Sequence, residues 1–172
     1  MKYLLITLFL SISSQAATTY EIKESLAKYT VKHLLKTVTG ESKEIKGKGV
    51  CDKSACEFLL AVPVKSFDSA NTNRDLHMLE VMKGAKYPLV VARVSFPESV
   101  FKSKNWSGEV ELELAGIKKK VPLTLEISEK DLFIHGDFVF KCSDFQIERP
   151  SLLTVAIDDD VKMTVNTTWS KK

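Results

Sequence analysis

Residue types that commonly carry chemistry form no recognisable catalytic constellation in this sequence. It contains no Gly-x-Ser-x-Gly elbow, no His-Glu-x-x-His pair and no phosphate-binding P-loop. The stretch Gly47-Lys48-Gly49 lacks the third glycine of a dinucleotide-binding turn. His33, His77 and His135 come from separate segments, so core or surface histidines are favoured over a three-histidine metal site. We therefore expect no catalytic residue, no metal and no cofactor.

Two cysteines are spaced for a local cross-link. Cys51 and Cys56 flank a short polar loop, and a tight hairpin would place them opposite each other, within the distance that a disulfide needs. One pair of thiols lacks the further ligands that zinc requires. We predict a Cys51–Cys56 disulfide, with two buried free thiols as the alternative. Cys142 is left over, and the alternation of its segment turns it inward as a buried free thiol.

An export signal is predicted at the start of the chain. Lys2 is followed by the apolar run Leu4 to Ile12, and the small residues Ser14 and Ala16 occupy the positions of a cleavage site. A membrane anchor or a buried first strand is the alternative, but the run is far shorter than the ~20 residues that span a bilayer. We expect a signal peptide over residues 1–16, one domain over residues 17–172, and a periplasmic or secreted protein.

Composition narrows the class of protein. A hydrophobic fraction of 44% with 27% charged residues is an ordinary globular balance, which excludes a disordered chain. Lysine and arginine number 25 against 22 acidic residues, and the net charge of +3 is too small and too dispersed for a nucleic-acid partner.

Apolar and polar residues alternate along most of the chain. The pattern is clearest in 109–114, 121–127 and 132–140, and strict alternation over 4–8 residues predicts strands with one buried face. Turn residues separate these segments, so sequential strands should pair antiparallel. The acidic run Asp158–Asp160 is interpreted as a solvated turn rather than a cation site.

One segment departs from this alternation. Residues 71–84 place Leu76, Leu79 and Met82 at three-residue intervals, with Asn71 or Asn73 as a cap and Gly84 as a stop. This spacing predicts a short helical insertion in an otherwise all-β chain. About eight strands must hide one apolar face, and a barrel with a helical flap over one end fits better than a sandwich.

Several stretches, in this order, resemble one family. The order and spacing of these stretches carry the likeness over nearly the whole chain after residue 17, although no single motif is decisive. The stretches are Tyr29–Leu34, Val62–Asp68, Asn73–Met78, Lys86–Pro88, Leu114–Leu123 and Phe138–Ile147. The sequence thus resembles the YceI-like family of exported polyisoprenoid-binding proteins. The Cys51–Cys56 loop and the pair Lys141-Cys142 depart from the family pattern.

The resemblance implies an extended eight-stranded antiparallel barrel, lipocalin-like, that holds an isoprenoid lipid of the quinone or prenyl phosphate type. It also implies transient contact with a membrane. Arg74 and His77 could meet a polar headgroup at the mouth, although a structural pair with a carboxylate is favoured for Arg74. The side chains expected to line the cavity, each of which could instead be ordinary core, are Val31, Leu60, Val62, Phe67, Val90, Val94, Leu112, Leu123, Leu125, Phe138, Phe140 and Met163.

Two other functions stay open from the sequence. A secreted stress-related or adhesion-type module would act through its outer surface and would expose an apolar patch. An enzyme acting on a bound lipid would place an ionisable residue with a shifted pKa inside the barrel.

Overall fold

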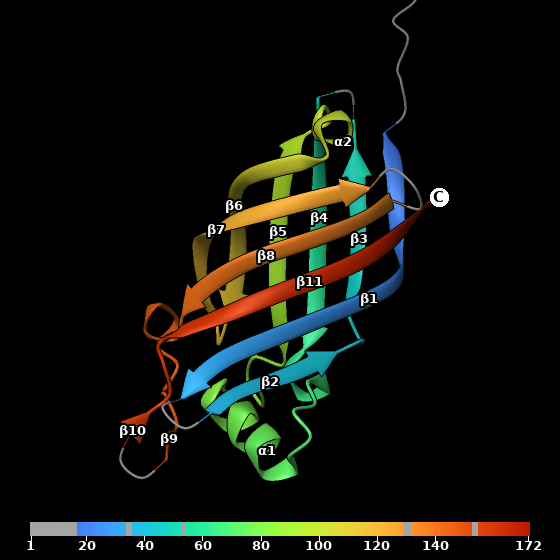
Figure 1. Ribbon diagram of the computed structural model, residues 1–172. Helices are drawn as coiled ribbons and strands as arrows, with labels where there is room; N and C mark the ends of the chain where they lie inside the picture. The colour runs from blue at the N-terminus through green and yellow to red at the C-terminus, as the bar shows by residue number, and fades with distance from the viewer. Residues whose placement is uncertain (1–16, 34–35, 53, 129–131, 153–154) are drawn as a thin grey trace, which may run out of the picture.

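Strands make up most of the molecule (Figure 1). The computed structural model describes residues 17–33, 36–52, 54–128, 132–152 and 155–172, so the predicted signal peptide over residues 1–16 lies outside the described residues. The strands are β1 (Thr18–His33), β2 (Lys36–Ser42), β3 (Lys46–Cys51), β4 (Ala55–Pro63), β5 (Leu89–Pro97), β6 (Asn105–Leu114), β7 (Ile117–Ser128), β8 (Phe133–Lys141), β9 (Ser151–Leu152), β10 (Val155–Ala156) and β11 (Asp160–Lys171). The helices are α1 (Thr72–Val81) and α2 (Val100–Ser103), with 3₁₀ turns at Val64–Ser66 and Ser143–Phe145.

The sheet closes on itself as an antiparallel barrel. Its order β11-β8-β7-β6-β5-β4-β3-β1 returns to the start because β1 also pairs with β11. Strand β2 pairs with the second half of β1, outside this ring of eight strands. The predicted fold class, an eight-stranded antiparallel lipocalin-like barrel with a short helical insertion, is confirmed. The structure adds α2, a second short helix that alternation did not indicate.

Alternation along each strand decides which side chains face the barrel interior. On β7 every second residue from Val121 to Ile127 is buried and every residue between them is exposed. Strand β8 repeats this pattern, so Phe138 and Phe140 point inward. This period of two follows from the pleat of the strand.

Packed aromatic rings close one end of the barrel. Phe58 stacks on Phe96 at 5.5 Å between ring centroids and meets Trp169 edge-on at 4.8 Å. Phe101 of α2 and Trp106 of β6 also pack against Phe96, with ring centroids 5.9 Å and 5.8 Å away. We call Phe58, Phe96 and Trp169 the aromatic floor. The predicted disulfide lies in the β3–β4 hairpin, where Cys51 and Cys56 face each other with Cα atoms 4.0 Å apart.

Helix α1 lies across the opposite end of the barrel (Figure 1). Its start is set by Asn71, whose side-chain oxygen accepts a hydrogen bond from the Arg74 amide at 3.0 Å. At its other end Lys83 takes a left-handed conformation and the Gly84 amide donates to the Leu79 carbonyl. The predicted helix and its Asn71 cap are confirmed. Among the described residues, no helix has the length and apolarity needed to cross a bilayer.

Candidate functional site

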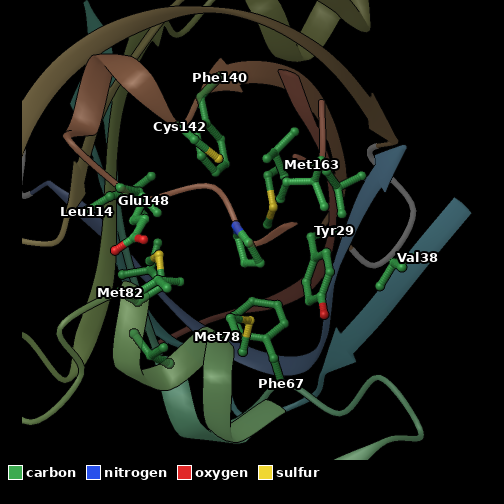
Figure 2. A pocket seen from close by; sticks show the side chains of 18 of the residues that line it. Tyr29, Val38, Phe67, Met78, Met82, Leu114, Phe140, Cys142, Glu148 and Met163 are labelled. Carbon is green, nitrogen blue, oxygen red and sulfur yellow. The ribbon is translucent and has the colours of Figure 1, made fainter. Parts of the chain in front are cut away.

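A cavity of about 190 Å³ lies between α1 and the barrel interior, and we call it the mouth cavity. Figure 2 shows its lining closing round from several elements, with Met78 and Met82 of α1 facing Phe140 and Cys142 across the space. Side chains from β1, β5, β6, β8 and β11 form the walls. The lining comprises Tyr29, Val31, Val38, Val64, Phe67, Arg74, His77, Met78, Val81, Met82, Val90, Leu112, Leu114, Phe138, Phe140, Cys142, Ile147, Glu148, Pro150, Ile157, Val161 and Met163.

The charged side chains of this lining, together with His77, gather at the rim. The His77 side chain is 52% exposed and its Nδ1 lies 3.3 Å from Glu80 Oε2. Glu148 is also exposed, while the rest of the lining is almost entirely aliphatic, aromatic or sulfur-containing. Such a site takes up hydrocarbon inside and offers polar contacts only at its entrance.

Arg74 is fixed at the rim by the chain just before α1. Its Nε donates to Ser69 Oγ at 2.8 Å and its Nη2 donates to the Ser69 carbonyl oxygen at 2.6 Å. The Ser69 hydroxyl in turn donates to a carboxylate oxygen of Asp75. Arg74 is thus linked to the Asp75 carboxylate through Ser69, which stands between the guanidinium and Asp75. The arrangement holds the guanidinium in one place beside the cavity.

Two titratable groups of the cavity wall are kept neutral. Burial raises the pKa of the Cys142 thiol to about 11 and raises the pKa of the Tyr29 hydroxyl above its ordinary value. A thiol that stays protonated is a poor nucleophile. Both groups therefore behave as parts of an apolar wall rather than as reactive groups, and the expected inward position of Cys142 is confirmed.

A second, smaller cavity of about 50 Å³ lies between the mouth cavity and the aromatic floor, and we call it the deep cavity. Phe138 lines both cavities. The other residues of the deep cavity are Phe58, Leu60, Ala92, Val94, Phe96, Val110, Leu123, Leu125, Ile134, Gly136, Val165, Thr167 and Trp169.

The structure divides the predicted lining between the two cavities. The predicted residues that line the mouth cavity are Val31, Phe67, Val90, Leu112, Phe138, Phe140 and Met163, together with Arg74 and His77 at the rim. Those that line the deep cavity are Leu60, Val94, Leu123 and Leu125, along with Phe138. Val62 is buried at 6% exposure and lines neither cavity, so it is ordinary core.

Sequence reasoning missed the side chains that enter the mouth cavity from outside the barrel wall. Met78, Val81 and Met82 come from α1, and Ile147, Pro150 and Ile157 come from the segments between β8 and β11. The four-residue spacing of Met78 and Met82 could have pointed to them, since α1 must bury one face against the barrel. The segment 142–157 has no periodicity that would have marked it.

Family and structure comparisons agree with this geometry. The family model of the YceI-like domain matches residues 18–169. BcnA of Burkholderia cenocepacia has a TM-score of 0.70 at 16% identity, over 85% of this chain and 96% of that one. A polyisoprenoid-binding domain from Saccharophagus degradans, implicated in plant cell wall breakdown, has a TM-score of 0.64 at 14% identity, over 89% and 98%.

A third similar structure is the YceI protein of Campylobacter jejuni, with a TM-score of 0.61 at 18% identity, covering 100% of this chain and 98% of that one. No curated protein is significantly similar to this chain in sequence. At such low identities these three structures establish the barrel fold.

Proposed function

The chain belongs to the YceI-like domain family, and on that premise we propose that it is an exported protein that binds and carries an isoprenoid lipid. The observation that supports this proposal is the mouth cavity, whose inner wall is apolar and whose polar groups Arg74, His77 and Glu148 stand at the entrance. The name of the S. degradans relative, a polyisoprenoid-binding domain, points to the same class of ligand. The protein acts as a binder rather than an enzyme.

The cavity size sets how much of a tail can be buried there. An apolar cavity of about 150 Å³ in another protein stays dry and binds benzene, so 190 Å³ accommodates roughly one or two isoprene units. Burial of each CH₂ contributes about 0.8 kcal/mol, or about 4 kcal/mol per isoprene unit. Association itself costs about 4–15 kcal/mol. The mouth cavity alone therefore supports weak binding, and tight binding needs headgroup contacts or a deeper tail.

The rim supports headgroup contacts of two kinds. The guanidinium of Arg74, held by Ser69, can donate to a quinone carbonyl or to a phosphate. The Glu148 carboxylate at the same opening repels a phosphate but has little effect on a neutral quinone. Glu148→Gln should therefore strengthen binding of a prenyl phosphate and leave binding of a short-chain quinone unchanged, which separates the two ligand types.

Blocking the cavity tests the proposed function. Leu112 is 1% exposed and lines the mouth cavity, so Leu112→Trp fills it at a cost of about 1–3 kcal/mol in stability. The matched control is Glu113→Trp, which adds the same ring on the outer face of β6. Protein purified from its own host should release a prenyl compound on solvent extraction, and the folded Leu112→Trp variant should release none. If folded native protein releases no lipid and takes up neither farnesol nor a short-chain quinone, the proposal is wrong.

We also propose export and a transient contact with a membrane. The Cys51–Cys56 disulfide supports an oxidising compartment, because such bonds are rare in the reducing cytosol. Leu76 is 55% exposed on α1, the helix that contributes Met78 and Met82 to the mouth cavity. N-terminal sequencing of the exported protein should begin at Ala17 or Thr18, and a start at Met1 would contradict export by a cleaved signal.

A further inference from the structure

Side chains at one level of the barrel separate the mouth cavity from the deep cavity. On several strands, inward residues two positions apart face different cavities. The pairs, with the residue of the mouth cavity first, are Val90 and Ala92 on β5, Leu112 and Val110 on β6, and Met163 and Val165 on β11. On β8 the inward order is Phe140, Phe138 and Gly136, and Phe138 borders both spaces. The ring of Phe138 is thus part of the partition.

The position of Phe138 in the sheet places its ring at the boundary. It pairs with Met163 of β11, which lines the mouth cavity, and with Leu123 of β7, which lines the deep cavity. The next inward residue on β8 toward the floor is Gly136, which brings no side chain into the interior. Leu125 approaches to 3.1 Å of the position that a Gly136 Cβ would take. The part of the deep cavity next to Phe138 is therefore bordered by Gly136 and by the leucines of β7.

Phe138 also differs from the other inward rings in its packing. Phe140 packs edge-on against Phe145 at 5.6 Å, and the rings of the aromatic floor hold one another. Within the described part of the chain, Phe138 has no aromatic partner. The Phe138 side chain borders both cavities, whereas Phe140 borders the mouth cavity alone, so only removal of the Phe138 ring would join the two spaces.

We propose that Phe138 is the specificity-determining residue for tail length, and this inference rests on the proposed function. With the ring in its place, a tail that enters past α1 ends at Phe138 once the mouth cavity is full. Without the ring, the tail continues into the deep cavity as far as Phe58 and Trp169 of the aromatic floor. Phe138 thus decides how much of an isoprenoid the barrel buries.

A series of prenyl alcohols with one to four isoprene units tests this inference: isoprenol, geraniol, farnesol and geranylgeraniol. Affinity is measured by displacement of a fluorescent apolar probe. For the native protein, affinity should rise to geraniol and then level off. For Phe138→Ala it should continue to rise, with farnesol bound at least about tenfold more tightly than by the native protein. The matched control is Phe140→Ala, which removes the same ring from the same face of β8, within the mouth cavity only.

The outcomes separate the two proposals. If Phe140→Ala levels off at the same length as the native protein while Phe138→Ala does not, Phe138 sets the length. If Phe138→Ala levels off where the native protein does, or if both variants extend the series equally, the inference about Phe138 is wrong and the proposed function stands. If no form binds any alcohol or a short-chain quinone, the proposed function itself is wrong.

A more conservative substitution at Phe138 tests the inference in case Phe138→Ala does not fold. Phe138→Leu keeps most of the buried apolar volume and should show the same extension in weaker form. Adding Ala92→Leu to this variant fills the deep cavity from β5 and should cancel the extension. If the double variant still binds farnesol more tightly than the native protein does, the tail does not pass into the deep cavity.

Discussion

Trp169 meets Phe58 edge-on across the barrel interior, with their ring centroids 4.8 Å apart. The two residues lie on β11 and β4, strands that do not pair with each other. The indole Nε1 donates to Thr167 Oγ1 at 2.8 Å, so the polar edge of this 3%-exposed ring is satisfied. The contact joins opposite walls and closes the floor of the deep cavity.

Truncation of this ring should be costly. We expect Trp169→Ala to lower the free energy of unfolding by about 3–5 kcal/mol, because it removes a buried ring that neighbours cannot replace. Trp169→Phe keeps a ring but leaves the Thr167 hydroxyl without its donor, for a smaller loss of about 1–3 kcal/mol. Urea unfolding measures both, and a loss below about 1 kcal/mol for the alanine variant would show that the floor does not stabilise the barrel.

The three cysteines should differ in reactivity. Alkylation of the folded, non-reduced protein should label none of them, because Cys51 and Cys56 are bonded and Cys142 is buried with a raised pKa. Unfolding without reductant should release one reactive thiol, and none in Cys142→Ala. Mass spectrometry counts the labels, and three labels on the native chain would mean that no disulfide exists.

Reduction of the disulfide should lower stability moderately. The bond closes a loop with a sequence separation of 5, for which chain entropy corresponds to about 2 kcal/mol. Unfolding of the Cys142→Ala protein with and without reductant isolates this effect from the free thiol. An unchanged unfolding midpoint would show that hairpin pairing alone accounts for this end of the barrel.

The cap of α1 should affect both stability and ligand retention. Asn71→Ala removes the side-chain acceptor of the Arg74 amide, and we expect a loss of about 1 kcal/mol. Asn73→Ala is the matched control, since Asn73 is exposed within α1 and does not cap it. Faster hydrogen exchange in α1 and faster release of bound lipid should accompany Asn71→Ala alone. Equal effects of the two variants would contradict the capping role.

His135 should titrate above its ordinary pKa of 6.5. Asn166 Oδ1 lies 2.6 Å from its Nδ1 and Asp137 Oδ2 lies 3.2 Å from its Nε2. Two oxygen acceptors face the ring, and only the imidazolium donates from both nitrogens, so the hydrogen bond to Asn166 followed by that to Asp137 raises the pKa. An NMR titration should show this, and Asn166→Ala should bring the pKa down.

The sign of the stability effect follows from this raised pKa. Stabilisation by protonated His135 is fully present below pH 6.5 and is lost as the pH rises through the higher pKa of the folded state. The free energy of unfolding of the native protein should therefore exceed that of His135→Gln by more at pH 5 than at pH 8. The difference between the two pH values should stay below about 1 kcal/mol, because this network is accessible to solvent. A difference that is larger at pH 8 would contradict the assignment.

Much of the fold could be predicted from the sequence, because the alternation of apolar and polar residues indicates which face of a strand each side chain lies on. The inward positions of Leu112, Leu123, Phe138 and Phe140 follow from a period of two, and the break in that period located α1. The spacing of Cys51 and Cys56 around a short loop favoured the disulfide, and the structure decided between it and two free thiols by placing the two residues opposite each other in the β3–β4 hairpin.

Only the tertiary structure decided where the interior is empty. Val62 and Leu60 both follow the alternation of β4, yet Leu60 borders the deep cavity while Val62 packs without facing either cavity. The partition at Phe138 depends on side chains from β5, β6, β7 and β11 that meet it across the barrel. Alternation states which way a side chain points, whereas empty space depends on the summed sizes of side chains brought together from distant parts of the chain.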